Sequence, residues 1–454
     1  MDLATAASWW DLHNERYLSQ LREFLSFQSI STDPAFKPAC GECAKWVCSH
    51  LESIGFQSEL KQTETLPVVF ARYRVSSTAP TVVVYGHYDV QPPGDLSDWT
   101  SPPFEPHVRD GRIYARGAVD NKGQLFFVIK ALENLIAHKA LTCNITLVVE
   151  GEEESGSGGL SAKLPEWKNE LAGDVLLVCD TGMPSGKPTI MVGLRGIAGL
   201  TFELHGPARE LHSGYHGNLA KNPALHLAKI LAAMTNADGS VAVPGFYDGI
   251  APVDDSLRAL INSQPFDPIA YEQETGCPPT GGEATYPVAE RVGLRPSIDI
   301  HGILSGYAGP GIKTIVPPWA RATLSTRLVL GQKPQRIIEL LEYFIRERTP
   351  TDMRLKVIER DLGGPALLVS PEHPTLKLCA SVLTEVFEVP PVYRCHGASI
   401  PVLSELAHVS GAQPVIAGFS LESDRLHASN ESFGLDRMRR GFLYICRFLS
   451  RLTA

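Results

Sequence analysis

The sequence lacks any long apolar segment. No stretch of its 454 residues approaches ~20 consecutive apolar side chains, so we expect no membrane span. It has no run of lysine and arginine and carries a formal net charge of −9, which argues against nucleic acid as a partner. The N-terminus has an acid at Asp2 and no basic region before an apolar core, so no secretory signal is readable. We therefore expect a cytoplasmic protein.

The sequence also lacks two matching Cys-x-x-Cys pairs and a nucleotide-binding motif. Of nine cysteines, only Cys40, Cys43 and Cys48 lie close together, and no second Cys-x-x-Cys pair accompanies them. Because the segment around them has the pattern of an amphipathic helix, we expect reduced cysteines rather than a redox or zinc motif. The stretch SGSGG at 155–159 stands where phosphate-binding loops lie, but three glutamates precede it and would repel a phosphate. A nucleotide site is therefore not expected.

Length and hydrophobic patterning indicate two domains. A chain of 454 residues is too long for one ordinary core, and 44% hydrophobic with 20% charged residues is typical of a globular protein. Apolar runs alternate with helical patterns up to residue 179, which predicts an α/β domain with a mostly parallel sheet and helices on both faces. Over 194–363 the order becomes β-α-β-β-α-β, typical of a two-layer, ferredoxin-like α+β domain. We therefore expect one domain of residues 1–193 and 364–454, interrupted by an inserted domain of residues 194–363.

Acids and histidines follow the predicted strands of the first domain. TVVVY at 81–85 leads into His87, NITLVV at 144–149 leads into a run of glutamates that includes Glu154, and DVLLVC at 174–179 leads into Asp180. Asp120 precedes a helical pattern, and QPVIAGF at 413–419 leads towards His427. Parallel strands deliver their carboxyl ends to one edge of a sheet. The side chains are expected to gather there, where crowded carboxylates need a cation.

The resulting donor set combines two imidazoles with three carboxylates, which are His87, Asp120, Glu154, Asp180 and His427. This mixture suits Zn²⁺ most readily, with Mn²⁺ and Co²⁺ as alternatives. Five donors are too many for one catalytic zinc with an open position, but they divide well over two ions if one carboxylate bridges. We expect Asp120 to be that bridge. Two such ions would activate a water and polarise a carbonyl.

The neighbouring acids receive separate roles. Asp89, two residues after His87, is placed to orient the imidazole. Glu153, beside a metal-binding Glu154, is the natural general base. Glu150 and Glu152 are expected to be structural or solvated.

Several segments together resemble a known family. They are GHYDVQP, RGAVDNKGQ, EGEEESGSGG, ELHSG, RPSIDIHGI, KTIVPPWARATLSTRLV and ASIPV. They resemble the dinuclear zinc peptidases that include aminoacylase, carboxypeptidase G and the carnosinase-like cytosolic dipeptidases. The resemblance covers nearly the whole chain and is closest to the dipeptidase branch. It implies the same roles for the residues above and a cis peptide bond between Asp120 and Asn121.

The resemblance also adds residues that spacing alone does not single out. His212 is similar to the lid-domain histidine that reaches the partner subunit's site and stabilises an oxyanion, which implies a homodimer formed through the inserted domain. Arg327 is similar to the arginine that holds a substrate carboxylate. The family's Arg-Glu-Gly-Gly-Ser-Ile-Pro appears here as RCHGASIP at 394–401, a changed and longer loop. This segment, with Arg394 and Ser399, is expected to meet the C-terminal end of the substrate.

These observations predict a metal-dependent hydrolase that cleaves the peptide bond of dipeptides or short peptides. An N-acyl-amino-acid deacylase with the same centre is the alternative, since the same machinery would cleave an acylated amine. A catalytically silent metal or peptide binder on the same fold is less favoured, because Glu153 and every predicted metal ligand are present.

Overall fold

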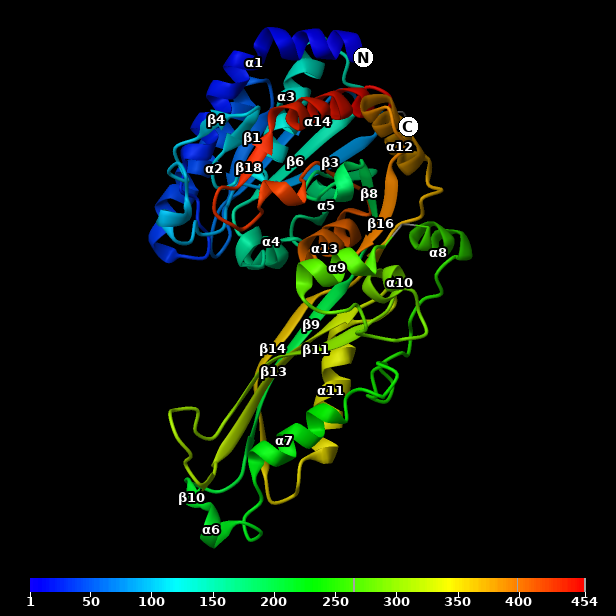
Figure 1. The fold of residues 1–454 in the computed structure, drawn as a ribbon. Helices are drawn as coiled ribbons and strands as arrows, with labels where there is room; N and C mark the ends of the chain where they lie inside the picture. Colours follow the sequence, from blue (N-terminus) through cyan, green and yellow to red (C-terminus); the bar gives the residue numbers. More distant parts are fainter. Residues whose placement is uncertain (264–265, 398, 453–454) are drawn as a thin grey trace. The chain divides into compact units, whose positions relative to one another are not determined.

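Two compact units make up the protein, whose computed structural model describes residues 1–263, 266–397 and 399–452. The first unit comprises Met1–Val192, Val369–Tyr393 and Glu405–Ala454, and the second comprises Gly193–Leu368 and Arg394–Ser404 (Figure 1). The sequence pattern assigns 394–404 to the first domain, but its contacts lie in the second unit. Arg195 Nε, for example, donates to the carbonyl of Gly397 at 2.9 Å.

The first unit is built on a sheet whose strands follow the order β1-β2-β6-β3-β7-β17-β8. The four neighbours β6, β3, β7 and β17 are parallel, and the strands outside them pair antiparallel. Every residue of β6 and all but the first of β3 are buried, so this part of the sheet is covered on both faces. The predicted α/β fold with a largely parallel central sheet is confirmed. The strands are β1 (Gln57–Lys61), β2 (Val68–Tyr73), β3 (Thr81–His87), β6 (Asn144–Glu150), β7 (Val175–Val178), β8 (Thr189–Leu194) and β17 (Gln413–Gly418).

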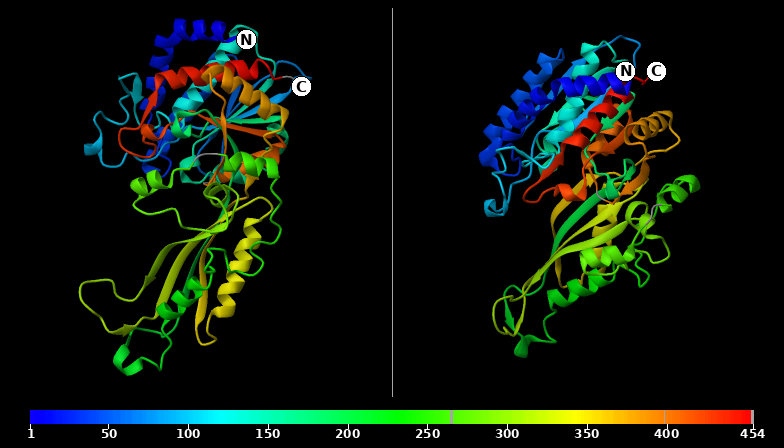
Figure 2. Two further views of the ribbon diagram at one scale, coloured as in Figure 1. Left: turned by 45° about the vertical axis from the view of Figure 1, so that its right-hand side comes forward. Right: turned by 45° about the horizontal axis from the view of Figure 1, so that its top comes forward.

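Three long helices of this unit contact one another: α1 (Leu3–Ser26), α3 (Lys122–Ala137) and α14 (Leu435–Leu449) (Figure 2). The approach of α14 to α3 is close because Gly441 has no side chain, and a Cβ there would lie 2.6 Å from the Phe127 ring. Between β6 and β7 the chain forms two short helices, α4 (Gly158–Lys163) and α5 (Lys168–Leu171). Among the described helices, none is both long and apolar enough to cross a membrane. The other helices are α2 (Lys37–Ser53), α12 (Pro374–Phe387) and α13 (Pro401–Ser410).

A small antiparallel sheet of the first unit, with order β18-β5-β4, was not expected from the sequence. It consists of β4 (His107–Arg109), β5 (Arg112–Tyr114) and β18 (Ser432–Gly434). Strand β18 lies immediately after the segment that carries His427, and β5 lies immediately before the segment that carries Asp120. The small sheet therefore ties together two segments that are about 300 residues apart in sequence.

The second unit contains a four-stranded antiparallel sheet of order β11-β13-β9-β14. Helices α7 and α11 pack on it, and their apolar residues share one core with alternate residues of β9 and β13. Along the chain these elements follow the order β-α-β-β-α-β. Their bounds are β9 (Gly196–His205), α7 (Pro223–Ala232), β11 (Ser297–Ser305), β13 (Trp319–Leu328), α11 (Pro334–Arg348) and β14 (Arg354–Gly364). A lid or dimerisation role for this unit stays a prediction.

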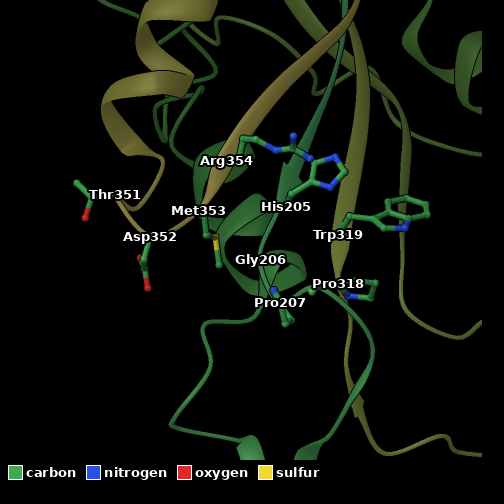
Figure 3. A pocket seen from close by; sticks show the side chains of 10 residues that line it. His205, Gly206, Pro207, Pro318, Trp319, Thr351, Asp352, Met353 and Arg354 are labelled. Carbon is green, nitrogen blue, oxygen red and sulfur yellow. The ribbon is translucent and has the colours of Figure 1, made fainter.

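The remaining elements of the second unit are short. They are β10 (Leu211–His212), α6 (Ser213–His216), α8 (Asp255–Asn262), α9 (Pro268–Thr275), α10 (Val288–Gly293), β12 (Ile315–Val316) and β15 (Leu367–Leu368); β16 (Val392–His396) runs from the first unit into the second. An open hollow of about 680 Å³ lies beside the end of β9 and is lined by His205, Trp319 and Arg354 among others (Figure 3). None of the predicted site residues lines it.

Candidate metal centre

Four of the five predicted ligands, all but Asp120, lie at or beyond the carboxyl ends of parallel strands of the first unit. His87 is the last residue of β3 and pairs in register with Glu150, the last residue of β6. Asp180 stands two residues after β7, and Asp120 stands two residues before α3. Because β6, β3 and β7 are parallel neighbours, their ends meet at one edge of the sheet. The side chains that follow these strands in the sequence therefore lie together in one cluster.

Two groups of side chains in this cluster could each hold a metal ion. The first is His87, Asp120 and Asp180, and the second is Asp120, Glu154 and His427; in each, the ligand atoms lie within 4.8 Å of one another. Asp120 belongs to both groups. Its Oδ1 lies 3.3 Å from His87 Nε2, and its Oδ2 lies 2.8 Å from His427 Nε2. Each carboxylate oxygen thus faces a different imidazole, which is the geometry that a bridging ligand requires.

The chemistry of these residues fits a pair of divalent cations. His87 Nε2 and Glu154 Oε1 are buried and have no hydrogen-bond partner within the described part of the chain. A buried polar atom without a partner is costly, and a cation would satisfy both. Neutral imidazole and carboxylate donors suit Zn²⁺ and related ions. The residues present therefore fit the metals that the donor set implies.

Without metal, the negative charge of the clustered carboxylates is offset by protons. Burial disfavours a charged His87, but Asp180, Asp120 and Asp89 together raise its pKa well above the ordinary value. A hydrogen bond to Asp120 raises the pKa of His427 to about 9. Burial and then the repulsion of Asp120 raise the pKa of Glu154 to about 7, and burial likewise raises that of Asp180. Bound cations would take the place of these protons, so metal binding should release protons.

Asp89 holds both the first imidazole and the turn after β6. Its buried carboxylate lies 3.3 Å from His87 Nδ1 and accepts the backbone N–H groups of Glu153 and Glu154 at 3.3 and 3.1 Å. The side chain therefore fixes an imidazole and the two adjacent glutamates at once. Burial raises the pKa of Glu153, which suits a group that must take up a proton.

Glu150 is structural and buried rather than solvated. Its Oε1 accepts from the Tyr85 hydroxyl at 2.7 Å and from the Ser157 hydroxyl at 2.9 Å, and burial raises its pKa to about 8. Glu152 accepts from the Thr65 hydroxyl and from the backbone N–H of Gly159. Both acids therefore support the turn that presents Glu153 and Glu154.

Three contributors to the centre were missed by sequence reasoning. Asn121 Nδ2 donates to Asp180 Oδ1 at 2.8 Å and to the carbonyl of Cys179 at 2.7 Å. Gln91 Nε2 donates to Glu154 Oε2 at 2.9 Å. The third is Glu431, which binds the backbone around Asp120. Asn121 and Gln91 lie inside the quoted segments RGAVDNKGQ and GHYDVQP, and Glu431 follows His427 by four residues, so proximity to the ligands was the available signal.

The other predicted site residues belong to the second unit. Arg327 Nη1 donates to Ser399 Oγ at 2.9 Å, so the structure brings these two together. Arg394 is exposed, and Ala398 in the same loop lies outside the described residues. His212 is exposed, and its Nδ1 accepts the backbone N–H of Gly214 at 3.0 Å. In a neutral imidazole this leaves the proton on Nε2, which is then free to donate.

The peptide bond between Asp120 and Asn121 is cis, as the resemblance implied. A family model described as "Peptidase family M20/M25/M40" matches residues 83–451, which is most of the chain. The chain belongs to this peptidase family. The resemblance to the dinuclear peptidases is thereby confirmed, as is the prediction of a peptidase.

Individual relatives of this M20 peptidase match along almost its whole length. The Cys-Gly metallodipeptidase dug1 of Schizosaccharomyces pombe is 26% identical, covering 98% of this chain and 97% of the relative. The Beta-Ala-His dipeptidase of Rattus norvegicus is 24% identical, covering 98% and 94%. Among solved structures, an M20 family metallo-carboxypeptidase from Sulfolobus solfataricus superposes with a TM-score of 0.84 at 29% identity, covering 96% and 98%. These similarities extend over both units of the chain.

Proposed function

We propose that this M20 peptidase is a cytoplasmic, zinc-dependent dipeptidase that works as a homodimer. The single observation that carries the proposal is Asp120, whose two carboxylate oxygens face two separate ligand groups. The names of two full-length relatives, a Cys-Gly metallodipeptidase and a Beta-Ala-His dipeptidase, support dipeptides as the substrate class. His87 and Asp180 would hold one ion, Glu154 and His427 the other, and Asp120 would bridge them.

When bound, two divalent ions would supply a water of lowered pKa and a polarised carbonyl. Glu153 would act as the base that takes up a proton from the attacking water and returns it to the leaving amine. The raised pKa of its buried carboxyl supports this role, because a base with a pKa nearer the working pH both accepts and returns a proton effectively. Asp89 supports it further by holding the backbone N–H of Glu153 in place.

The second unit would supply substrate contacts and act as lid and dimerisation domain. His212 would donate its Nε2 proton to the oxyanion in the partner subunit's site, and the hydrogen bond that its Nδ1 accepts favours the required tautomer. Arg327 would bind the substrate's terminal carboxylate through its guanidinium. Ser399 supports this placement by accepting from Arg327, and Arg394 would bind the same end of the substrate.

A substrate panel tests the proposal. Metal-free protein, reloaded with zinc and separately with manganese or cobalt, is assayed on dipeptides, on longer peptides and on N-acyl amino acids. We expect chelator-sensitive hydrolysis that requires a free α-amine. Preference for acylated amines would instead indicate a deacylase. Absence of any hydrolysis by the metal-loaded dimer would refute the proposal that the protein is a metal-dependent hydrolase. Sedimentation analysis of the same sample tests the homodimer.

A further inference from the structure

The buried carboxylate of Glu431 binds the segment that carries Asp120. Its Oε2 accepts from Arg116 Nη1 at 2.8 Å and from the backbone N–H of Gly117 at 2.9 Å. Its Oε1 accepts from the backbone N–H groups of Val119 at 2.9 Å and Asp120 at 3.1 Å. All four donors thus come from the five residues that end at the predicted bridging ligand.

These contacts exclude Glu431 from being a ligand itself. A carboxylate has about four lone-pair sites on its two oxygens, and each oxygen here already accepts two hydrogen bonds. The side chain is fully buried, and Arg116, its charged partner, is 1% exposed. Glu431 is also absent from both ligand groups.

The backbone around Glu431 links the same segment to His427. The carbonyl of Glu431 accepts the N–H of Ala115 at 3.2 Å, and β18 pairs with β5 from the next residue onward. His427 precedes Glu431 by four residues, and between them the Asn430 side chain accepts the N–H of Thr100 and donates to the carbonyl of Asp98. Arg116 Nη2 also donates to the carbonyl of Pro92, five residues after His87.

We propose that Glu431 is a positioning residue for the metal pair: it fixes the backbone at Val119 and Asp120 so that the bridging carboxylate meets both ligand groups. This inference rests on the proposed dinuclear centre. A buried ion pair is weak support for stability alone, because apolar residues of similar volume often replace one without loss. The donors instead indicate that Glu431 fixes one short segment, since both of its carboxylate oxygens accept hydrogen bonds from residues 116–120 alone.

Zinc binding by Glu431→Gln tests the inference. The amide keeps one acceptor oxygen and places an NH₂ group against N–H donors, so two of the four hydrogen bonds are lost. The matched control is Glu283→Gln in the second unit, where another buried glutamate pairs with Arg295 at 2.8 Å and accepts from Tyr247 at 3.0 Å. Metal-free samples are titrated with zinc against a competing chelator, and Co²⁺-loaded samples are compared by their visible spectra.

We expect zinc affinity to fall roughly 10–100-fold in Glu431→Gln, with a changed cobalt spectrum, because partners that orient metal ligands typically have effects of that size. Glu283→Gln should lose stability and keep wild-type zinc affinity. Wild-type affinity in a folded Glu431→Gln, or an equal loss in the control, would overturn the inference. Wild-type protein that binds no divalent ion would refute the proposed function as a whole.

A measurement on the wild-type chain keeps the inference testable even if Glu431→Gln does not fold. Amide hydrogen exchange in the metal-free protein should show slow exchange at Val119 and Asp120, since both N–H groups bond to a buried carboxylate. Exchange at the rate of an exposed loop would show that Glu431 does not hold this segment without metal, and the inference would fail.

Discussion

Glu154 should destabilise the metal-free protein as the pH rises, and replacement by glutamine should remove that effect. Its side chain is 4% exposed, and burial followed by repulsion from Asp120 raises its pKa from 4.5 to about 7. A group with a raised folded-state pKa contributes its full stability below the unfolded value and loses it as the pH rises through the folded value. One pKa unit corresponds to ~1.36 kcal/mol, so ionisation of Glu154 should cost the folded state about 3 kcal/mol.

Urea unfolding with excess chelator at pH 4.5 and pH 8 measures this cost. Glutamine stays neutral, so metal-free Glu154→Gln should nearly match wild type at pH 4.5 and exceed it by about 3 kcal/mol at pH 8. Comparing the two proteins cancels the titration of other groups, such as Glu150. With saturating zinc the order should reverse, because wild type gains binding energy that the amide cannot supply in full. Equal metal-free stabilities at pH 8, or a difference that does not change with pH, would refute the reasoning.

Other predictions address catalysis, metal affinity and packing. Glu153→Ala should keep both ions, measured by metal analysis, and lose turnover by about 10²–10⁴-fold; wild-type turnover would exclude it as the base. Zinc affinity should increase as the pH rises towards 9, because His427, with its pKa raised to about 9 by Asp120, must lose a proton to bind; calorimetry in two buffers measures the released protons. Gly123→Ala should prevent folding or abolish zinc binding, because its Cβ would lie 1.9 Å from the carbonyl oxygen of Ala118; an unchanged melting temperature and zinc affinity would contradict this. Phe127→Ala should lower the free energy of unfolding by about 3–5 kcal/mol, since Phe127 is fully buried and packs on Phe419; a loss under 1 kcal/mol in urea would show that the core closes around the gap.

The parts of the centre that follow strands could be predicted from sequence because strand ends are local signals. The end of a strand such as β3 is visible in the sequence, because the apolar run 81–85 stops there. Parallel pairing with β6 and β7 then determines which edge of the sheet His87 reaches. The place of 394–404 was missed, because Arg195 and Arg327 hold that segment through contacts distant in sequence.

The role of Glu431 could not be predicted from the sequence. A glutamate in HASNE carries no periodic signal, and its partners Arg116, Val119 and Asp120 lie more than 300 residues earlier in the sequence. The pairing of β18 with β5 brings them together, and these three-residue strands are too short to be recognised by alternation. Its role could be inferred only after the topology was known.

Asp89 and Glu431 make the same kind of contact with two predicted ligands. Each is buried, each is outside the two ligand groups, and each accepts the backbone N–H of a predicted ligand: Glu154 for Asp89, and Asp120 for Glu431. Backbone hydrogen bonds of this kind do not depend on a bound cation, so both carboxylates would hold the predicted ligands in the metal-free protein as well. The cost is two further buried carboxylates near an acidic cluster: Arg116 pairs with Glu431, whereas Asp89 lies against His87, whose pKa it helps to raise. The metal-free protein should therefore be less stable than it would be without these buried carboxylates. The predicted ligands should in turn need little rearrangement to bind metal.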